Sequence, residues 1–177
     1  MTWKSHMAIA AAACLPFNPH ALPLALAGST APDWIELIIR ITTGKRIKHR
    51  GETHYLIIPI IIICVAILID YKDFLFWFGV GYLTHWFADS VTITGVPISP
   101  LSKNNVTLFG GRIRTGDPIE YILSFGLLFC VLFLLKPNLN FLESDRAFNP
   151  YLMDYSRLNE QKIIDNKEFL ERRFKFF

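Results

Sequence analysis

The sequence contains little cysteine and little charge, and each shortage excludes a class of protein. Its three cysteines, Cys14, Cys64 and Cys130, stand singly in apolar runs, with no CxxC pair anywhere in the 177 residues. An odd number of isolated cysteines argues against a disulfide framework and against a thiolate metal site. Charged residues make up only 19% of the chain, and the net charge of +3 is too small and too mixed in sign to indicate nucleic-acid binding.

Apolar residues are abundant instead. They form 52% of the chain, and the mean hydropathy is positive. Apolar runs at 55–69, 74–91 and 119–135 each predict a helix, although the first is short for a membrane span of roughly twenty residues. We therefore expect an all-α fold: a small integral membrane bundle of about three to four apolar helices. Residues 1–137 would form this domain, and residues 138–177 a polar, helical tail.

Residues 1–28 allow two interpretations. The segment resembles a secretory signal peptide, because a basic residue is followed by an Ala-rich run and by small residues that end at Gly28. Removal of such a peptide would discard His6. Pro16 and Pro19 interrupt the apolar run near its middle, however, and this favours a broken or re-entrant pair of helices. The two interpretations differ in whether His6 belongs to the working protein.

Two further stretches predict helix starts. Ser29-Thr30-Ala31-Pro32-Asp33 combines a hydroxyl cap, a proline for the first turn and an acid near the positive helix end. Gly116-Asp117-Pro118 has the same character, with Glu120 one turn into the helix that follows.

The last turns of the 74–91 run contain a histidine and a carboxylate. His85 and Asp89 are four residues apart and so share one face of a helix. The polar turn 70–73 predicts an antiparallel hairpin, which would return both residues to the side where His49 and His54 follow a basic loop.

The predicted topology gathers polar residues on one side of the bundle, namely Asp33, His49, His54, His85, Asp89, Asp117 and Glu120, with His6 as a further candidate. Imidazole and carboxylate are the ligands expected for zinc or a similar divalent ion. Three interpretations follow from the residues. The cluster could serve a metal-dependent enzyme, a structural metal or helix-locking site in a partner subunit, or a proton pathway. Ligands on loops and helix ends argue against the pathway.

Several motifs in combination resemble the YdjM-like membrane-bound metal-dependent hydrolases. The resemblance covers residues 6 to 120 and rests on Pro32-Asp33, His49-Arg50-Gly51-x-Thr53-His54, Gly81-Tyr82-Leu83-Thr84-His85-x-x-Ala88-Asp89 and Gly95-Val96-Pro97. That family is itself distantly similar to zinc-dependent phospholipase C and related nucleases. The sequence departs from the family pattern at Ile35 and Glu36, where many members have an aspartate and a histidine, and at Asp117.

The resemblance implies a divalent cofactor, zinc in one to three ions, held by His6, Asp33, His49, His54, His85 and Asp89. The expected reaction is hydrolysis of a phosphoester of a membrane lipid or lipid-linked substrate by a metal-activated water. Asp89 and Glu120 would act in catalysis, and Arg50, Arg112 or Arg114 could clamp the phosphate. The resemblance implies a protein of the bacterial inner membrane, and the basic loops predict that its site faces the cytoplasm.

Overall fold

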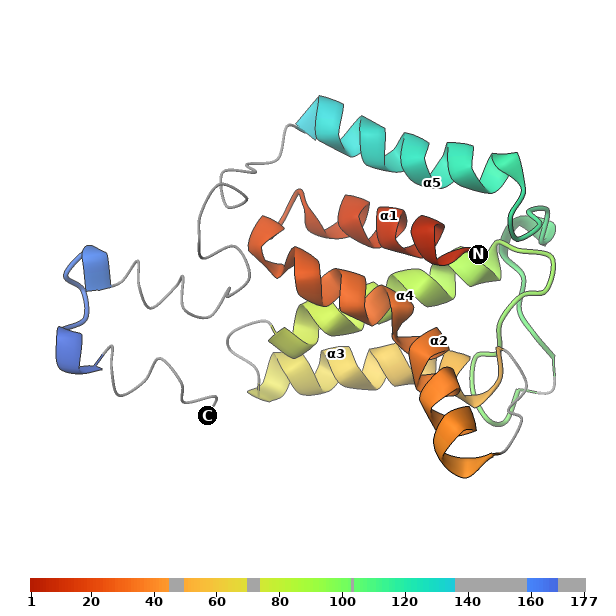
Figure 1. Cartoon of the computed structure of the whole chain (residues 1–177), viewed down its shortest axis with the longest axis horizontal. Coiled ribbons are helices and arrows are strands. Elements are labelled where there is room, and N and C mark those ends of the chain that lie inside the picture. Colours follow the sequence, from red (N-terminus) through yellow and green to blue (C-terminus); the bar gives the residue numbers. More distant parts are fainter. Residues whose placement is uncertain (45–49, 70–73, 103, 136–158, 169–177) are drawn as a thin grey trace. The chain divides into compact units, whose positions relative to one another are not determined.

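The structure, a computed structural model, describes residues 1–44, 50–69, 74–102, 104–135 and 159–168. The chain divides into two compact units, Met1–Pro137 and Asn138–Phe177. The first unit contains α1 (Trp3–Cys14), α2 (Leu22–Thr43), α3 (Ile57–Ile69), α4 (Phe74–Ser90) and α5 (Pro118–Cys130), which a π-helical turn, Val131–Leu135, extends (Figure 1). The described residues form helices and two isolated β-bridges but no strand, so the all-α prediction is confirmed. Most of the predicted tail helix lies outside the described residues.

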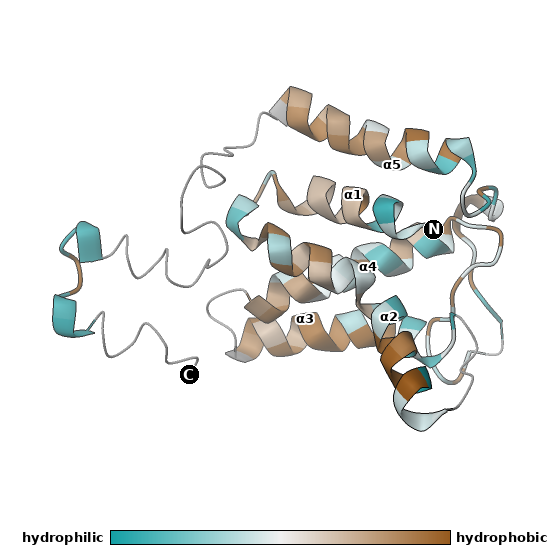
Figure 2. Cartoon of the chain, in the orientation of Figure 1, coloured by the Kyte–Doolittle hydropathy of each residue, from teal (hydrophilic) through white to brown (hydrophobic). Residues whose placement is uncertain are grey.

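The predicted membrane-spanning helices are not confirmed. Among the described residues, no helix combines the length and the apolar content that crossing a membrane requires. The most apolar helix, α3, has 13 residues, whereas a full span needs roughly twenty. Figure 2 shows apolar residues along α3 and α5 and in the second half of α2.

The N-terminal segment forms the broken helix pair that its prolines predict. Alanine has the highest helix propensity, and the Ala-rich run forms most of α1. The helix ends at Cys14, and Pro16 and Pro19 follow, which have no backbone N–H for a continuing helix. A 3₁₀ turn, Pro19–Ala21, then leads into α2.

The predicted helix start at Ser29 is wrong. Helix α2 begins at Leu22, with Pro23 in its first turn, and continues through Pro32, which lies in its interior. An interior proline removes one hydrogen bond and crowds the preceding turn, which kinks a helix but need not end it. Figure 1 shows α2 changing direction along its length. Packing against α4 therefore outweighs the local preference of Ser29 to Asp33 for starting a new helix.

Two glycines let α2 and α4 cross with their backbones in contact. A Cβ atom on Gly28 would lie 2.0 Å from the carbonyl oxygen of Phe78, and one on Gly81 would lie 2.0 Å from that of Ala25. No real side chain fits at such distances, so only glycine allows this approach. Next to the crossing, Ala25 packs in a small core with Cys14, Ala21 and Trp77. This crossing fixes α4 relative to the first half of α2.

The long loop after α4 folds back over the end of that helix. Val96 and Val106 exchange backbone hydrogen bonds of 3.1 and 2.8 Å, and the indole N–H of Trp86 donates to the carbonyl of Pro97 at 3.0 Å. Gly95 has a φ of +62° and lies so close to Val106 that a Cβ would be 2.6 Å from its carbonyl oxygen. The Gly-Val-Pro motif therefore has a structural role.

Replacing Gly81 with alanine should separate α2 from α4. We expect Gly81→Ala to lower the free energy of unfolding by about 1–3 kcal/mol, the usual cost of overpacking. Gly126→Ala is the matched control, because a Cβ there meets nothing within 4 Å; it should stabilise α5 by about 0.4–1 kcal/mol. Denaturant unfolding followed by circular dichroism measures both. Equal stability of Gly81→Ala and the wild type would contradict the close crossing.

Candidate metal centre

The candidate centre is built around the last two turns of α4. His85 and Asp89 are 1% and 2% exposed, and His85 Nε2 lies 3.7 Å from Asp89 Oδ2. The i,i+4 spacing places both side chains on the same helix face, as the sequence predicts. Buried ionisable groups of this kind need a partner or a bound ion.

The α2–α4 crossing orients the imidazole of His85. Its Nδ1 lies 2.7 Å from the carbonyl oxygen of Ser29, one residue after Gly28. Because a carbonyl oxygen only accepts, Nδ1 carries the proton and the lone pair of Nε2 faces the centre. A backbone carbonyl that fixes the tautomer in this way is the usual support of a metal-binding histidine.

Asp33 enters the centre from α2, in the turn that starts with Pro32. Its Oδ1 lies 3.4 Å from His54 Nε2 and 4.0 Å from His85 Nε2. The Asp33 side chain is 11% exposed, more than the four other residues of the centre. It is therefore the member that faces the surface.

His54 comes from the 3₁₀ turn Glu52–His54 before α3. Its Nδ1 lies 3.0 Å from the hydroxyl of Thr53, and the hydroxyl of Tyr82 on α4 donates to the backbone carbonyl of Thr53. Tyr82 thus ties the turn to the helix that provides His85 and Asp89. The sequence motifs contain Tyr82 and Thr53, but spacing alone does not reveal this link.

His6 enters from α1 and stacks on His85. The two ring centroids are 3.7 Å apart with an interplanar angle of 10°, and His6 Nε2 lies 3.4 Å from Asp89 Oδ1. Within the described parts of the chain, neither nitrogen of His6 nor Nε2 of His85 has a hydrogen-bond partner. Buried polar atoms are rarely left in this state, which suggests a missing ligand.

The donor atoms form two groups of three that could hold a metal ion. His6, His85 and Asp89 make one, and Asp33, His54 and His85 make the other; in each group the ligand atoms lie within 4.8 Å of one another. Ligands at 2.0–2.1 Å around a tetrahedral zinc ion are roughly 3.3 Å apart, close to the measured separations of 3.4 to 4.0 Å. The residues therefore fit a divalent ion.

The pKa values favour the metal-binding forms of these side chains. Burial, followed by the neighbouring His6, lowers the pKa of His85 to about 3, and burial also lowers the pKa of His6. Both imidazoles are therefore neutral at pH 7, as metal ligation requires. Burial alone would raise the pKa of Asp33 and Asp89, but the neighbouring imidazoles, His54 beside Asp33 and His6 beside Asp89, hold each pKa below its usual range.

Other predicted site residues lie in different surroundings. Glu120 is fully buried but accepts hydrogen bonds from the backbone N–H groups of Thr2 and Gly116, at 2.6 and 2.8 Å. Asp117 caps the start of α5. Neither belongs to the two groups of ligands found among the described residues. His49 lies outside the described residues, so its predicted role stays a prediction.

The three arginines proposed as phosphate clamps differ in exposure. Arg112 and Arg114 are exposed in the loop before α5. Arg50 is 6% exposed, and its guanidinium contacts Asp89 rather than solvent: Nε lies 3.0 Å from Oδ2, and Nη2 donates to Oδ1 at 3.0 Å.

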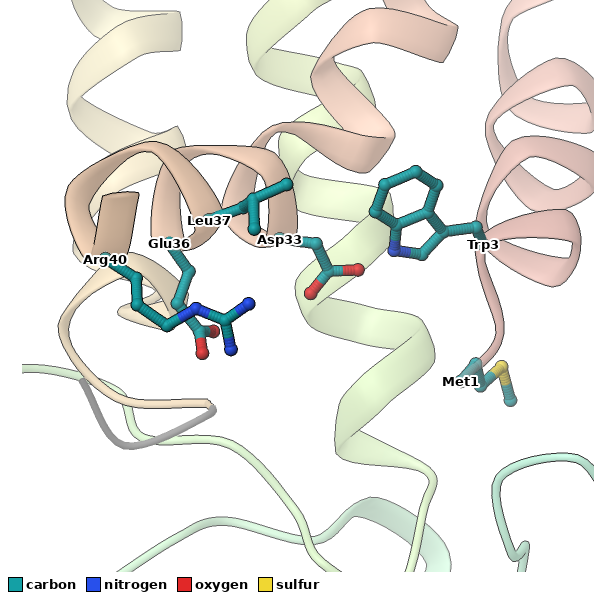
Figure 3. Close-up of a pocket in the computed structure, with 6 residues that line it drawn as sticks. All are labelled: Met1, Trp3, Asp33, Glu36, Leu37 and Arg40. Atoms are coloured by element: carbon teal, nitrogen blue, oxygen red, sulfur yellow. The ribbon is translucent and has the colours of Figure 1, made fainter. Parts of the chain in front are cut away.

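A surface pocket of about 290 Å³ leads to Asp33. It lies between the start of α1 and the second half of α2, and its lining residues are Met1, Trp3, Asp33, Glu36, Leu37 and Arg40. Figure 3 shows the Asp33 carboxylate pointing into the space between Trp3 on one side and Glu36 and Arg40 on the other. This pocket connects the centre to the surface, and sequence spacing alone does not indicate Trp3 or Arg40 as part of it.

Tyr82→Phe should loosen the turn that carries His54. Loss of the hydroxyl leaves the buried carbonyl of Thr53 without its donor, and we expect the free energy of unfolding to fall by about 1–2 kcal/mol. Tyr121→Phe is a suitable control, since the ring of Tyr121 stacks on Phe125 and should change stability little. Chemical denaturation of the two variants measures the difference, and equal stabilities would argue against the Tyr82 hydrogen bond.

A family model described as YdjM inner membrane protein matches residues 1–146. No curated protein and no solved structure matches the chain significantly. The distant similarity to phospholipase C and nucleases therefore stays an expectation from the motifs.

Proposed function

This chain belongs to the YdjM inner membrane protein family, and we propose that it is a membrane-bound, metal-dependent hydrolase that cleaves a phosphoester of a lipid or lipid-linked substrate. One observation carries the proposal: three buried histidines and two carboxylates from α1, α2, α4 and the turn before α3 converge, and the Nε2 atoms of His6 and His85 make no hydrogen bond within the described residues. The proposed substrate class draws on the membrane location of the family and on the surface pocket beside Asp33.

Asp89 lies beside two of the histidines. Its Oδ2 lies 3.7 Å from His85 Nε2 and its Oδ1 lies 3.4 Å from His6 Nε2, and Oδ1 is also paired with the N-terminal ammonium of Met1. The two groups of three ligands, which share His85, would each hold a divalent ion, zinc by the nature of its ligands. Such ions supply a hydroxide nucleophile near neutral pH and offset negative charge on a phosphate.

The side chains around the pocket would bind and orient the substrate. Arg40 offers a guanidinium that matches a phosphate or other anionic group, and Trp3 and Leu37, which are 52% and 40% exposed, offer apolar surface for the non-polar part of a lipid. Asp33 lines the pocket and also belongs to a ligand group, so it marks where the reacting bond would lie. Glu120, by contrast, has contacts that suit a structural tie between α5 and the start of α1.

Loss of either central ligand should remove both metal and activity. We expect His85→Ala and Asp89→Asn each to lower the metal affinity by about 100-fold or more. The rate of hydrolysis of phospholipid in vesicles, or of a generic phosphodiester, should fall by a similar factor. Elemental analysis measures the metal content, and an assay of the alcohol and phosphomonoester that hydrolysis releases measures the activity. His20→Ala is the matched control, because His20 lies in the 3₁₀ turn before α2 and outside both ligand groups.

The same experiment separates the enzyme from its chief alternative. A wild-type protein that binds metal but hydrolyses none of these substrates would favour a structural metal site in a partner subunit. Full metal content in both variants would show that the centre is placed on the wrong residues.

Arg40 should affect substrate binding more than chemistry. We expect Arg40→Ala to raise KM about 10-fold and to change kcat little, because the guanidinium contacts the substrate away from the reacting bond. Arg112→Ala tests the other location for the anion: an increase in KM for Arg112→Ala alone would place the anionic group at the loop before α5 instead of in the pocket. Steady-state kinetics on phospholipid vesicles gives both constants.

A further inference from the structure

Arg50 makes an unusually complete set of contacts for an arginine next to a candidate metal centre. Its Nε and Nη2 pair with the two oxygens of Asp89 at 3.0 Å each, in the bidentate geometry that is specific to arginine. Its Nη1 donates to the hydroxyl of Thr92 at 2.6 Å, and Nη2 lies 3.4 Å from the hydroxyl of Thr115. The hydroxyl of Thr92 in turn donates to the backbone carbonyl of Asp89 at 2.7 Å.

The backbone of Arg50 adopts an unfavourable conformation in order to place the side chain here. Its φ of +62° lies in the left-handed region, which costs a non-glycine residue about 1 kcal/mol or more. The side chain is nevertheless almost fully buried. In this position the guanidinium touches Asp89 and two threonines and faces away from solvent, so it is poorly placed to receive a phosphate.

We propose that Arg50 is a positioning residue: it holds the Asp89 carboxylate so that one oxygen faces His85 and the other faces His6. The inference rests on the proposed metal centre and adds a role that differs from the phosphate contact expected from the sequence. Arg50 contacts both oxygens and so fixes the plane of the carboxylate, and together with the N-terminal ammonium of Met1, which pairs with Oδ1 alone, it offsets the charge of Asp89. Asp89 then donates less charge to an ion, which leaves the ion a stronger Lewis acid.

Lysine should not replace Arg50 in this role. A lysine ammonium keeps the positive charge but is a single point donor, so it cannot hold both oxygens of Asp89 in one plane. Charge and geometry can therefore be separated by one conservative substitution. Arg114→Lys is the matched control, since Arg114 is an exposed arginine of the neighbouring loop.

The test measures Co²⁺ binding to the full-length protein by titration and by the visible absorption spectrum of the bound ion. We expect Arg50→Lys to raise the Co²⁺ dissociation constant about 10- to 100-fold and to change the spectrum, whereas Arg114→Lys matches the wild type. Thr92→Val, which removes the partner of Nη1 but keeps Arg50 and Asp89, should shift both readouts in the same direction by a smaller amount. This second variant keeps the test informative if Arg50→Lys does not fold.

The outcomes distinguish this inference from the metal centre itself. If His85→Ala abolishes Co²⁺ binding while Arg50→Lys and Thr92→Val bind with the affinity and spectrum of the wild type, the role of Arg50 is overturned and the centre stands. If His85→Ala also binds Co²⁺ normally, the centre is wrong and the role of Arg50 is lost with it. An equal loss of affinity in Arg114→Lys would show that the effect is not specific to the position of Arg50 and would overturn the inference as well.

Discussion

The close crossing of α2 and α4 is the constraint on which the rest of the structure depends. Gly28 and Gly81 let the two backbones touch, and the carbonyl of Ser29 then lies 2.7 Å from His85 Nδ1. That one hydrogen bond fixes the tautomer and direction of the central imidazole. Asp33, four residues further along α2, reaches the same imidazole from the other side of the Pro32 kink. A crossing held apart by even one methyl group would move these donors relative to one another.

The acids of the centre have different cationic neighbours. Asp33 and Asp89 are both held in their charged form, while His6 and His85 are neutral at pH 7. The guanidinium of Arg50 and the N-terminal ammonium of Met1 both pair with Asp89, whereas Asp33 faces a pocket that also contains Arg40. The charge of Asp89 is therefore offset within the fold itself.

Sequence reasoning predicts the parts of this protein that depend on local pattern. The helical class, the break at Pro16 and Pro19 and the pairing of His85 with Asp89 follow from composition and from the 3.6-residue period. The helix start expected at Ser29 fails because packing against α4 keeps Pro32 inside a longer helix. Contacts across elements, such as those of Tyr82 or Arg50, have no signal in spacing because they depend on the tertiary fold.

The order of the donors along the chain has a consequence for how the protein would acquire a metal ion. His6, Asp33, His54 and His85 come from four separate elements, and His6 and Asp89 meet although they are 83 positions apart in the sequence. An unfolded chain therefore presents no such site, and the donors assemble only when the helices have docked. An ion that binds them would stabilise the folded state alone, so the supply of metal would also set how long the protein survives proteolysis.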